Sequence, residues 1–391
     1  MSLLFLAPGL PSPGTGGGSL RMFHMVRFLG DRVALDLVAP ASDGVEAVAH
    51  FLRGSCREME FVLPSPGGAW RRVLRLGPYE KDPALAAAIR RRLTGGGYAA
   101  VQVEKPAMLP YVPADTRIPI ILDTWAFGLG GAVRALRHER GIATRARNLL
   151  RLARFSAFDA FCWPDTYCIL VVSEVDRERC LRARPDRRVL VVPNGVDCAA
   201  VRPGPFRDSG PPVLLFTGDM GFAPNVDAAL LLAFRILPEV RRFHPDAELR
   251  LAGRNPDPRL LALRGPGVVV TGKVADMTPH LNTAMVYVAP HFTGAGTRTK
   301  LLEAMAAGLP IVTTSLGIEG IAATPDRDVQ IADDPATTVT AILRLLANST
   351  ERRSLGAAAR RLVEERYEWS RCLAPLETLY AGLLPVRAAR C

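Results

Sequence analysis

A glycine-rich turn followed by basic and acidic side chains is the segment best suited to chemistry. The turn consists of Gly294, Ala295, Gly296 and Thr297. Arg298, Lys300 and Glu303 follow it on the helix that the pattern predicts from about residue 297. A helix start offers free N–H groups and a positive dipole, and two cations beside it suit a diphosphate. Glu303, one turn after Lys300, can accept hydrogen bonds from ribose hydroxyls; a surface Lys–Glu pair on an ordinary helix is the alternative.

A second glycine cluster lies near the N-terminus. Gly16, Gly17 and Gly18 follow an apolar strand and precede a helix, so their N–H groups could approach an anion. Ser19 stands where a dinucleotide-binding fingerprint needs its third glycine. Asp36 lies about where a ribose-binding acid would sit, which keeps a nicotinamide-dependent oxidoreductase open. A flexible loop without a ligand is the other interpretation.

The elements that must position these loops alternate between strand and helix. The predicted strands are residues 2–7, 33–39, 119–122, 189–192, 213–217, 248–252, 268–271 and 285–289. A predicted helix spans about 226–243. Short apolar strands separated by helices indicate parallel sheets covered on both faces. The fold class is therefore α/β, with two doubly wound domains.

The domain boundary is predicted in a segment rich in proline and glycine. We expect an N-terminal domain over residues 1–192, a linker over 193–212, a C-terminal domain over 213–365 and a final helical segment, 366–391, that crosses back to the first domain. Ligands of doubly wound sheets bind beyond the carboxyl ends of the strands. The loops at those ends should therefore carry the chemistry.

Composition excludes several classes of protein. The 391 residues are 49% apolar and 22% charged, which is typical of globular domains and not of disordered or fibrous chains. No apolar run is long enough for a membrane span, and the N-terminus lacks the features of a signal peptide, so a cytoplasmic protein is expected. The net charge of +11 favours anionic partners. Seven scattered cysteines indicate neither a disulfide framework nor a zinc site.

Several motifs occur in an order typical of one enzyme family. They are Val172–Arg177, Val192–Asp197, Gly218–Ala228, Gly272 with Asp276, Gly296–Pro310, Val312–Thr314, Gly317–Gly320 and Tyr367 with Trp369. Together they resemble the GT-B glycosyltransferases, in particular glycosyltransferase family 4 and its exopolysaccharide-associated sugar transferases. The resemblance covers essentially the whole chain and is most specific over residues 170–370.

The resemblance implies a retaining, metal-independent transferase that uses a nucleotide-diphosphate sugar, of the UDP or GDP type, and no cofactor. Glu303 matches the family's ribose-binding acid, and residues 294–297 would lie beside the donor sugar and phosphates. The glycines at 16–18 match the loop that approaches the diphosphate from the first domain. Gly218 belongs to a further donor-binding motif.

The sequence departs from the family pattern at three places. The histidine that the family carries after a middle strand of the first domain has no clear equivalent here. Ala295 stands where the family usually has a second glutamate, and Gly218–Gly221 stands where it has an arginine and a lysine. Arg298 and Lys300 could supply that charge, so both are candidate catalytic residues that stabilise the leaving diphosphate.

Four further features of the sequence could have a chemical role. Asp123, at a predicted strand end, is a candidate catalytic or acceptor-side carboxylate, and capping of the next loop is the alternative. Ser173 and Asp176 have the spacing of a helix capping box. Asp326 and Asp328 form a D-x-D pattern that we assign to a turn. Residues 134–154 hold seven arginines, and the stripe predicts either a solvated helix face or peripheral attachment to anionic membrane at its inner face.

The expected partners are a nucleotide sugar and a sugar, lipid-linked or small-molecule acceptor, with no nucleic acid. Three alternatives stay open. The first is another GT-B enzyme, such as a nucleotide-sugar epimerase or a phosphorylase. The second is the oxidoreductase, which the broken glycine fingerprint disfavours. The third is a two-lobed sugar-binding protein without catalytic activity.

Overall fold

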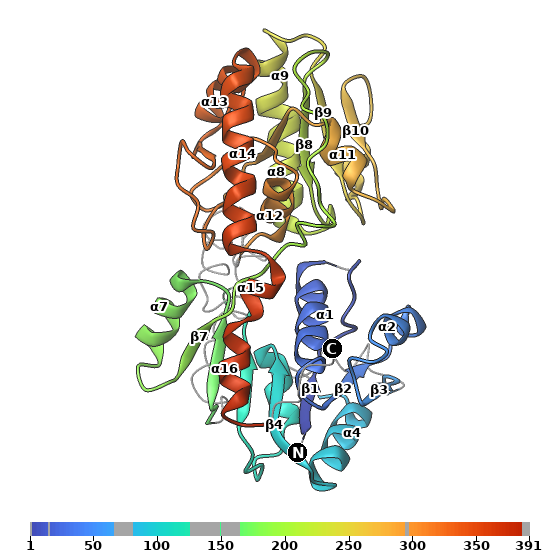
Figure 1. Cartoon of the computed structure of the whole chain (residues 1–391). Coiled ribbons are helices and arrows are strands. Elements are labelled where there is room, and N and C mark those ends of the chain that lie inside the picture. The colour runs from blue at the N-terminus through green and yellow to red at the C-terminus, as the bar shows by residue number, and fades with distance from the viewer. Residues whose placement is uncertain are drawn as a thin grey trace. The chain divides into compact units, whose positions relative to one another are not determined.

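The computed structural model describes residues 2–14, 16–65, 81–125, 149, 165–293 and 297–384. The chain divides into two compact units. The first unit comprises Met1–Pro193 and Leu373–Cys391, and the second comprises Asn194–Cys372. Each unit contains one parallel sheet with helices alternating between its strands (Figure 1). The expected fold class, two doubly wound α/β domains, is confirmed.

The sheet of the first unit has the order β3-β2-β1-β4-β5-β6-β7. Its strands are β1 (Ser2–Leu6), β2 (Leu35–Pro40), β3 (Glu58–Val62), β4 (Tyr98–Glu104), β5 (Ile120–Asp123), β6 (Cys168–Val171) and β7 (Val189–Val191). Its helices are α1 (Gly17–Gly30), α2 (Val45–Phe51), α4 (Pro83–Thr94), the 3₁₀ helix η1 (Pro106–Tyr111), α7 (Glu174–Ala183) and α16 (Pro375–Ala381). Strand order reverses between β1 and β4, and ligands of such sheets bind at the reversal.

The sheet of the second unit has the order β10-β9-β8-β11-β12-β13. Its strands are β8 (Val213–Thr217), β9 (Glu248–Ala252), β10 (Val268–Val270), β11 (Val286–Ala289), β12 (Ile311–Thr313) and β13 (Gln330–Ile331). Its helical segments are α8 (Ala223–Leu231), η2 (Leu232–Ile236), α9 (Leu237–Arg241), α10 (Pro258–Leu261), α11 (Thr278–Thr283), α12 (Thr299–Ala306), α13 (Pro335–Ala347), α14 (Ser349–Arg366) and α15 (Trp369–Leu373). Strand order here reverses between β8 and β11.

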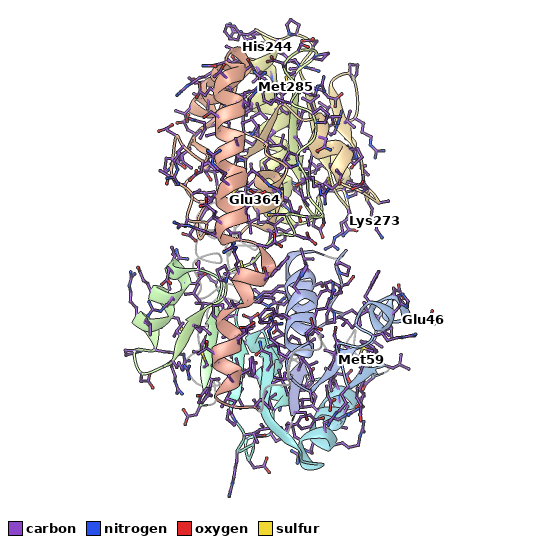
Figure 2. The ribbon with its side chains drawn as sticks, in the orientation of Figure 1. Glu46, Met59, His244, Lys273, Met285 and Glu364 are labelled. Atoms are coloured by element: carbon purple, nitrogen blue, oxygen red, sulfur yellow. The ribbon has the colours of Figure 1, made fainter. Side chains whose placement is uncertain are left out.

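Two labelled side chains show where the strands of the second sheet begin and where they end; the side at which they end is called the carboxyl edge. Lys273 follows the carboxyl end of β10 and Met285 precedes the amino end of β11, and Figure 2 shows them at opposite ends of this unit. Helix α12 begins on the carboxyl side, after β11, and ends before β12. It runs beside α14 (Figure 1). The carboxyl edge is the one at which the fold predicts a ligand site.

The helix expected over residues 226–243 is interrupted. A π-helical segment, η2, separates α8 from α9, and the N–H of Leu237 bonds the carbonyl of Leu232, five positions earlier. Pro238 follows immediately and has no N–H to donate to the preceding turn. The wider turn accommodates that proline, and the expected helix is present over residues 223–241 with a π-helical turn inside it.

The end of the chain returns to the first unit. The hydroxyl of Tyr380 in α16 donates to the side chain of Gln102 in β4. Glu377, also in α16, forms a 2.7 Å ion pair with Arg32 after α1. Within the described residues, no helix combines the length and the apolar character that crossing a bilayer requires.

Candidate functional site

Two glycines shape the carboxyl edge of the second sheet. Gly218 follows β8 with a φ of +152°, and Gly253 follows β9 with a φ of +150°. A Cβ on Gly253 would lie 1.7 Å from the carbonyl oxygen of Gly218, so a side chain cannot be added there without moving the β8 loop. Because both positions are glycine, neither turn places a side chain at the end of β8, and a side chain from α12 can approach it.

That side chain is Lys300, from the first turn of α12. Its Nζ lies 2.5 Å from the Oδ1 of Asn225 and 4.8 Å from the centre of the Phe216 ring in β8. A Cβ on Gly218 would come within 2.7 Å of the same nitrogen. Lys300 therefore places its charge beside the loop Gly218–Gly221, where the family resemblance left a gap in basic residues. Burial and the charge of Arg298 lower the pKa of Lys300 to about 7.

Two polar residues in this cluster received no role from the sequence. Asn225, in α8, is 5% exposed, and its Oδ1 is also 3.2 Å from the Nε2 of His291. His291 follows β11 and is 2% exposed; its Nδ1 is buried and has no partner among the described residues. Burial and the charges of Lys300 and Arg298 lower the pKa of His291 to about 2, so its ring is neutral. Asn225 stands inside the quoted motif Gly218–Ala228, whereas His291 lies before the motif that begins at Gly296, and spacing alone does not reveal their contact.

Glu303 lies one turn further along α12 and is half-buried. Burial raises the pKa of its carboxyl group to about 7, against the opposite influence of Lys300. Within the described part of the chain, no donor makes a hydrogen bond to this carboxylate. Its two oxygens are therefore available to a ligand that brings hydroxyl groups.

Arg298 is placed differently from Lys300. Its guanidinium donates to the carbonyl of Leu316 at 2.9 Å and to that of Thr293 at 3.2 Å. These bonds brace the segment before α12 against the loop after β12. The Oγ1 of Thr297 is buried and has no partner among the described residues. Gly294, Ala295 and Gly296 lie outside the described residues.

The glycines of the first unit begin helix α1. Gly16 has a φ of +113° and occupies the N-cap position, where no side chain caps the helix. A Cβ on Gly18 would lie 1.8 Å from the ring of Trp125, so the indole fills the space beside this residue. The backbone N–H groups of the first turn remain unpaired by any side-chain cap, which is the arrangement that anion binding needs.

Asp123, at the end of β5, is fully buried in an ion pair. Its two oxygens accept from Nε and Nη2 of Arg21 in α1, at 2.7 and 2.8 Å, and neither residue is exposed. The remaining Arg21 nitrogen donates to the carbonyls of Val192 and Pro193. Burial and the Asp123 charge raise the pKa of neighbouring Glu104 well above its ordinary value. Asp123 thus ties α1 to the end of the unit, an arrangement that favours a structural role over contact with an acceptor.

Other candidate residues also have structural partners. Asp36 lies at the start of β2, not at its carboxyl end, and bonds Arg57 and the Tyr98 hydroxyl. This position does not suit ribose binding, so the observation that kept an oxidoreductase open is lost. Ser173 caps α7 by accepting from the N–H of Asp176 at 3.1 Å, which confirms the capping interpretation.

The D-x-D pattern is a turn, as expected. Asp328 is 2% exposed, accepts from the N–H of Thr324 and pairs with Arg327. The part of the chain that the structure describes contains no group of three His, Cys, Asp or Glu residues arranged to hold a metal ion. The arginine stripe over residues 134–154 lies outside the described residues except at position 149, and its membrane role stays a prediction.

Comparison with known proteins agrees with the geometry. Residues 211–348 match the family model described as glycosyl transferases group 1. The phosphatidyl-myo-inositol mannosyltransferase of Mycolicibacterium smegmatis is 31% identical over 199 residues, which are 48% of this chain and 50% of that protein. The corresponding enzyme of Mycobacterium leprae is 27% identical over 90% of this chain and 88% of its own length. The chain thus spans half of the first relative and most of the second.

Solved structures share the fold at low identity. Sucrose-phosphate synthase from Thermosynechococcus elongatus superposes with a TM-score of 0.74 at 16% identity, over 97% of this chain and 98% of that one. Anabaena HepE, in a complex with UDP-glucose, gives 0.68 at 14% identity over 97% and 99%. The two sheets, the site at the carboxyl edge and these likenesses define a GT-B protein. Residues 211–348 thus match the group 1 glycosyl transferases, and the chain as a whole is similar to GT-B glycosyltransferases of the family 4 type.

Proposed function

We propose that the protein transfers a sugar from a nucleotide-diphosphate sugar to an acceptor hydroxyl, with retention of anomeric configuration and without a metal ion. One observation carries the proposal. Lys300 and Glu303 lie three residues apart on α12, which follows β11, the strand at which the strand order of the second sheet reverses. Within the described ranges, no carboxylate forms an ion pair with Lys300 and no donor bonds the Glu303 carboxylate. The positive charge of Lys300 matches the diphosphate of a nucleoside diphosphate, and the carboxylate of Glu303 matches its ribose hydroxyls.

In this proposal, each group has one task. The first turn of α12 and Lys300 bind the diphosphate, and they stabilise the charge that develops on it when the glycosidic bond breaks. Glu303 accepts hydrogen bonds from the ribose hydroxyls. Arg298 acts mainly by holding the segment that contains residues 294–297. Gly16, Gly17 and Gly18, at the start of α1, offer N–H groups to an anion.

The relatives suggest the kinds of substrate to test. The mycobacterial relatives are named as mannosyltransferases that act on phosphatidyl-myo-inositol. HepE has been solved with UDP-glucose. We therefore propose UDP- and GDP-sugars as donors, and a sugar, lipid-linked or small-molecule acceptor. A cytoplasmic enzyme with peripheral attachment at the inner membrane face is consistent with such an acceptor.

The test is product analysis with each UDP- or GDP-sugar, with and without acceptors, after chelation of divalent ions. A glycoside formed only when acceptor is present, with the donor's anomeric configuration by NMR, supports the proposal. Rearrangement of the donor alone indicates an epimerase. Phosphate-dependent cleavage indicates a phosphorylase. Binding of a sugar without any turnover would leave the sugar-binding protein as the answer.

A further inference from the structure

The contact between Asn225, His291 and Lys300 has a direction that the hydrogen-bond chemistry determines. The Nδ2 of Asn225 donates to the carbonyl of Asp219 at 2.8 Å, so the other amide atom, Oδ1, faces Lys300 and His291. An amide oxygen only accepts, which requires both neighbours to donate to it. His291 therefore carries its proton on Nε2. Asn225 is held by three partners from three different elements.

Asn225 is a neutral acceptor, and this property decides what Lys300 can do. A carboxylate at the same place would neutralise the ammonium group in an ion pair. An amide oxygen orients the group without neutralising it. An ammonium group has three donors, and among the described residues Asn225 is the acceptor that Lys300 uses. The remaining donors are free for a ligand.

We propose that Asn225, supported by His291, is the positioning residue that holds Lys300 toward the donor's diphosphate without neutralising it. The inference rests on the proposed function, since it names the device that prepares the same site. It adds two residues to which neither the sequence motifs nor the comparisons assign a task.

Among the described residues, three charged groups act on Lys300. Arg298 precedes it on the same chain segment and disfavours its charged form, while Glu303 on α12 and Asp219 after β8 favour that form. Asp219 is itself paired with Arg254 after β9, at 2.9 Å. His291, after β11, is neutral and adds no charge. The protonation of Lys300 therefore responds to a change at Asn225 in a predictable direction.

The experiment follows Lys300 directly in the unliganded protein. The chain contains four lysines, Lys81, Lys105, Lys273 and Lys300, so ¹³Cε-lysine labelling gives four resolvable sites. The Lys300 signal is identified by its loss in Lys300→Arg. Asn225→Ala removes the acceptor and should lower the pKa of Lys300. Asn225→Asp adds a carboxylate and should raise it.

Binding provides the second readout, with inorganic diphosphate and UDP or GDP as probes. We expect Asn225→Ala to weaken diphosphate binding about tenfold, the scale of one hydrogen bond to a charged group. Asn225→Asp should weaken it too, because the added charge opposes the anion. His291→Leu removes the N–H that bonds the Asn225 amide oxygen and should weaken diphosphate binding less than Asn225→Ala does. His291→Gln keeps a side-chain N–H donor at about the same distance and should restore the affinity. Thr340→Asp, on the exposed face of α13, controls for net charge.

The outcomes separate the two proposals. Opposite shifts of the Lys300 titration in Asn225→Ala and Asn225→Asp, with none in Thr340→Asp, support positioning. An unchanged titration in both Asn225 variants, with circular dichroism showing an intact fold, overturns it whatever the activity. If the titration shifts as expected but wild type binds neither UDP nor GDP, the proposed function fails and the positioning of Lys300 stands.

Discussion

The two units each place a polar cluster near the carboxyl ends of parallel strands, and the clusters differ in how far their hydrogen-bonding capacity is used. In the first unit, Arg21 satisfies both oxygens of Asp123 and two backbone carbonyls. In the second, Lys300 has one protein acceptor and Glu303 has no donor among the described residues. Charged residues near the carboxyl ends of strands therefore serve structure in the first unit, whereas in the second unit they keep hydrogen-bonding capacity that no described residue uses.

The physical basis of the difference is the cost of burying charge. A fully buried ion needs a partner of opposite charge and further hydrogen bonds, which Asp123 and Arg21 supply to each other. A partly buried ion is still hydrated by solvent, so it tolerates the lack of a protein partner until a ligand binds. A structural cluster differs from a binding site less in residue type than in whether its polar groups are all hydrogen-bonded within the protein.

The largest effect should come from breaking the saturated cluster. Arg21→Met leaves the carboxylate of Asp123 buried without a counterion, which should destabilise the first unit by about 3–5 kcal/mol. Denaturant unfolding monitored by hydrogen exchange in α1 and β5 measures the loss. Glu377→Gln, which removes a half-exposed ion pair with Arg32, is the matched control and should cost below about 1 kcal/mol. Equal losses of unfolding free energy in the two variants would show that the buried ion pair contributes no more to stability than the half-exposed one.

The next largest effect should fall on the unsaturated cluster and concern catalysis. Lys300→Ala should lower kcat/KM by about 10²–10³-fold, the scale of losing one donor that stabilises developing charge. Arg298→Ala should also reduce kcat/KM, through the loosened loop. Lys273→Ala removes an exposed lysine that follows β10 at the same edge and serves as the control. A Lys300→Ala enzyme with wild-type kcat/KM would show that the site lies elsewhere.

Glu303 should produce a smaller effect that depends on the ligand. Glu303→Ala should weaken binding of a nucleoside diphosphate by about 1.5–3 kcal/mol, since hydrogen bonds to a charged group are lost. Inorganic diphosphate has no ribose, so its affinity should not fall. Calorimetry with both ligands tests this, because Lys300→Ala should weaken both. An unchanged nucleoside diphosphate affinity would contradict the ribose assignment.

The smallest effect should be a pH dependence of stability in the unliganded second unit. Glu303 titrates near 4.5 when unfolded and about 7 when folded, so its contribution to stability falls as pH rises through that interval. Lys300 titrates near 10.5 when unfolded and about 7 when folded, so its contribution rises between those values. The pair should give a shallow minimum in stability near neutral pH.

Urea unfolding across that range, on wild type and two variants, checks the minimum. Lys300→Met should remove the rise on the alkaline side, and Glu303→Gln should remove the fall on the acid side. A wild-type profile that matches both variants would show that neither group shifts on folding.

Much of the fold follows from local patterns. The apolar runs and the turns between them located eight strands to within a residue or two, as at Val213–Thr217. These patterns predicted no range for β3, β4, β6, β12 or β13. Helical spacing alone placed Lys300 and Glu303 on the same side of α12. The exception is instructive: the helix expected over residues 226–243 changes to a π turn because Pro238 cannot donate to the turn before it.

By itself, the sequence determined the alternation of strand and helix, the start of α12 and the charges on it, because these depend on residues within one or two turns of each other. Only the tertiary structure decided which charges remained free. Arg21 meets Asp123 across 102 positions, and Asn225 meets Lys300 across 75. Such pairs form when sheet topology brings distant strand ends together, and spacing along the chain carries no record of them. For that reason Asp123 and Lys300 look alike as candidates in the sequence and differ in the folded protein.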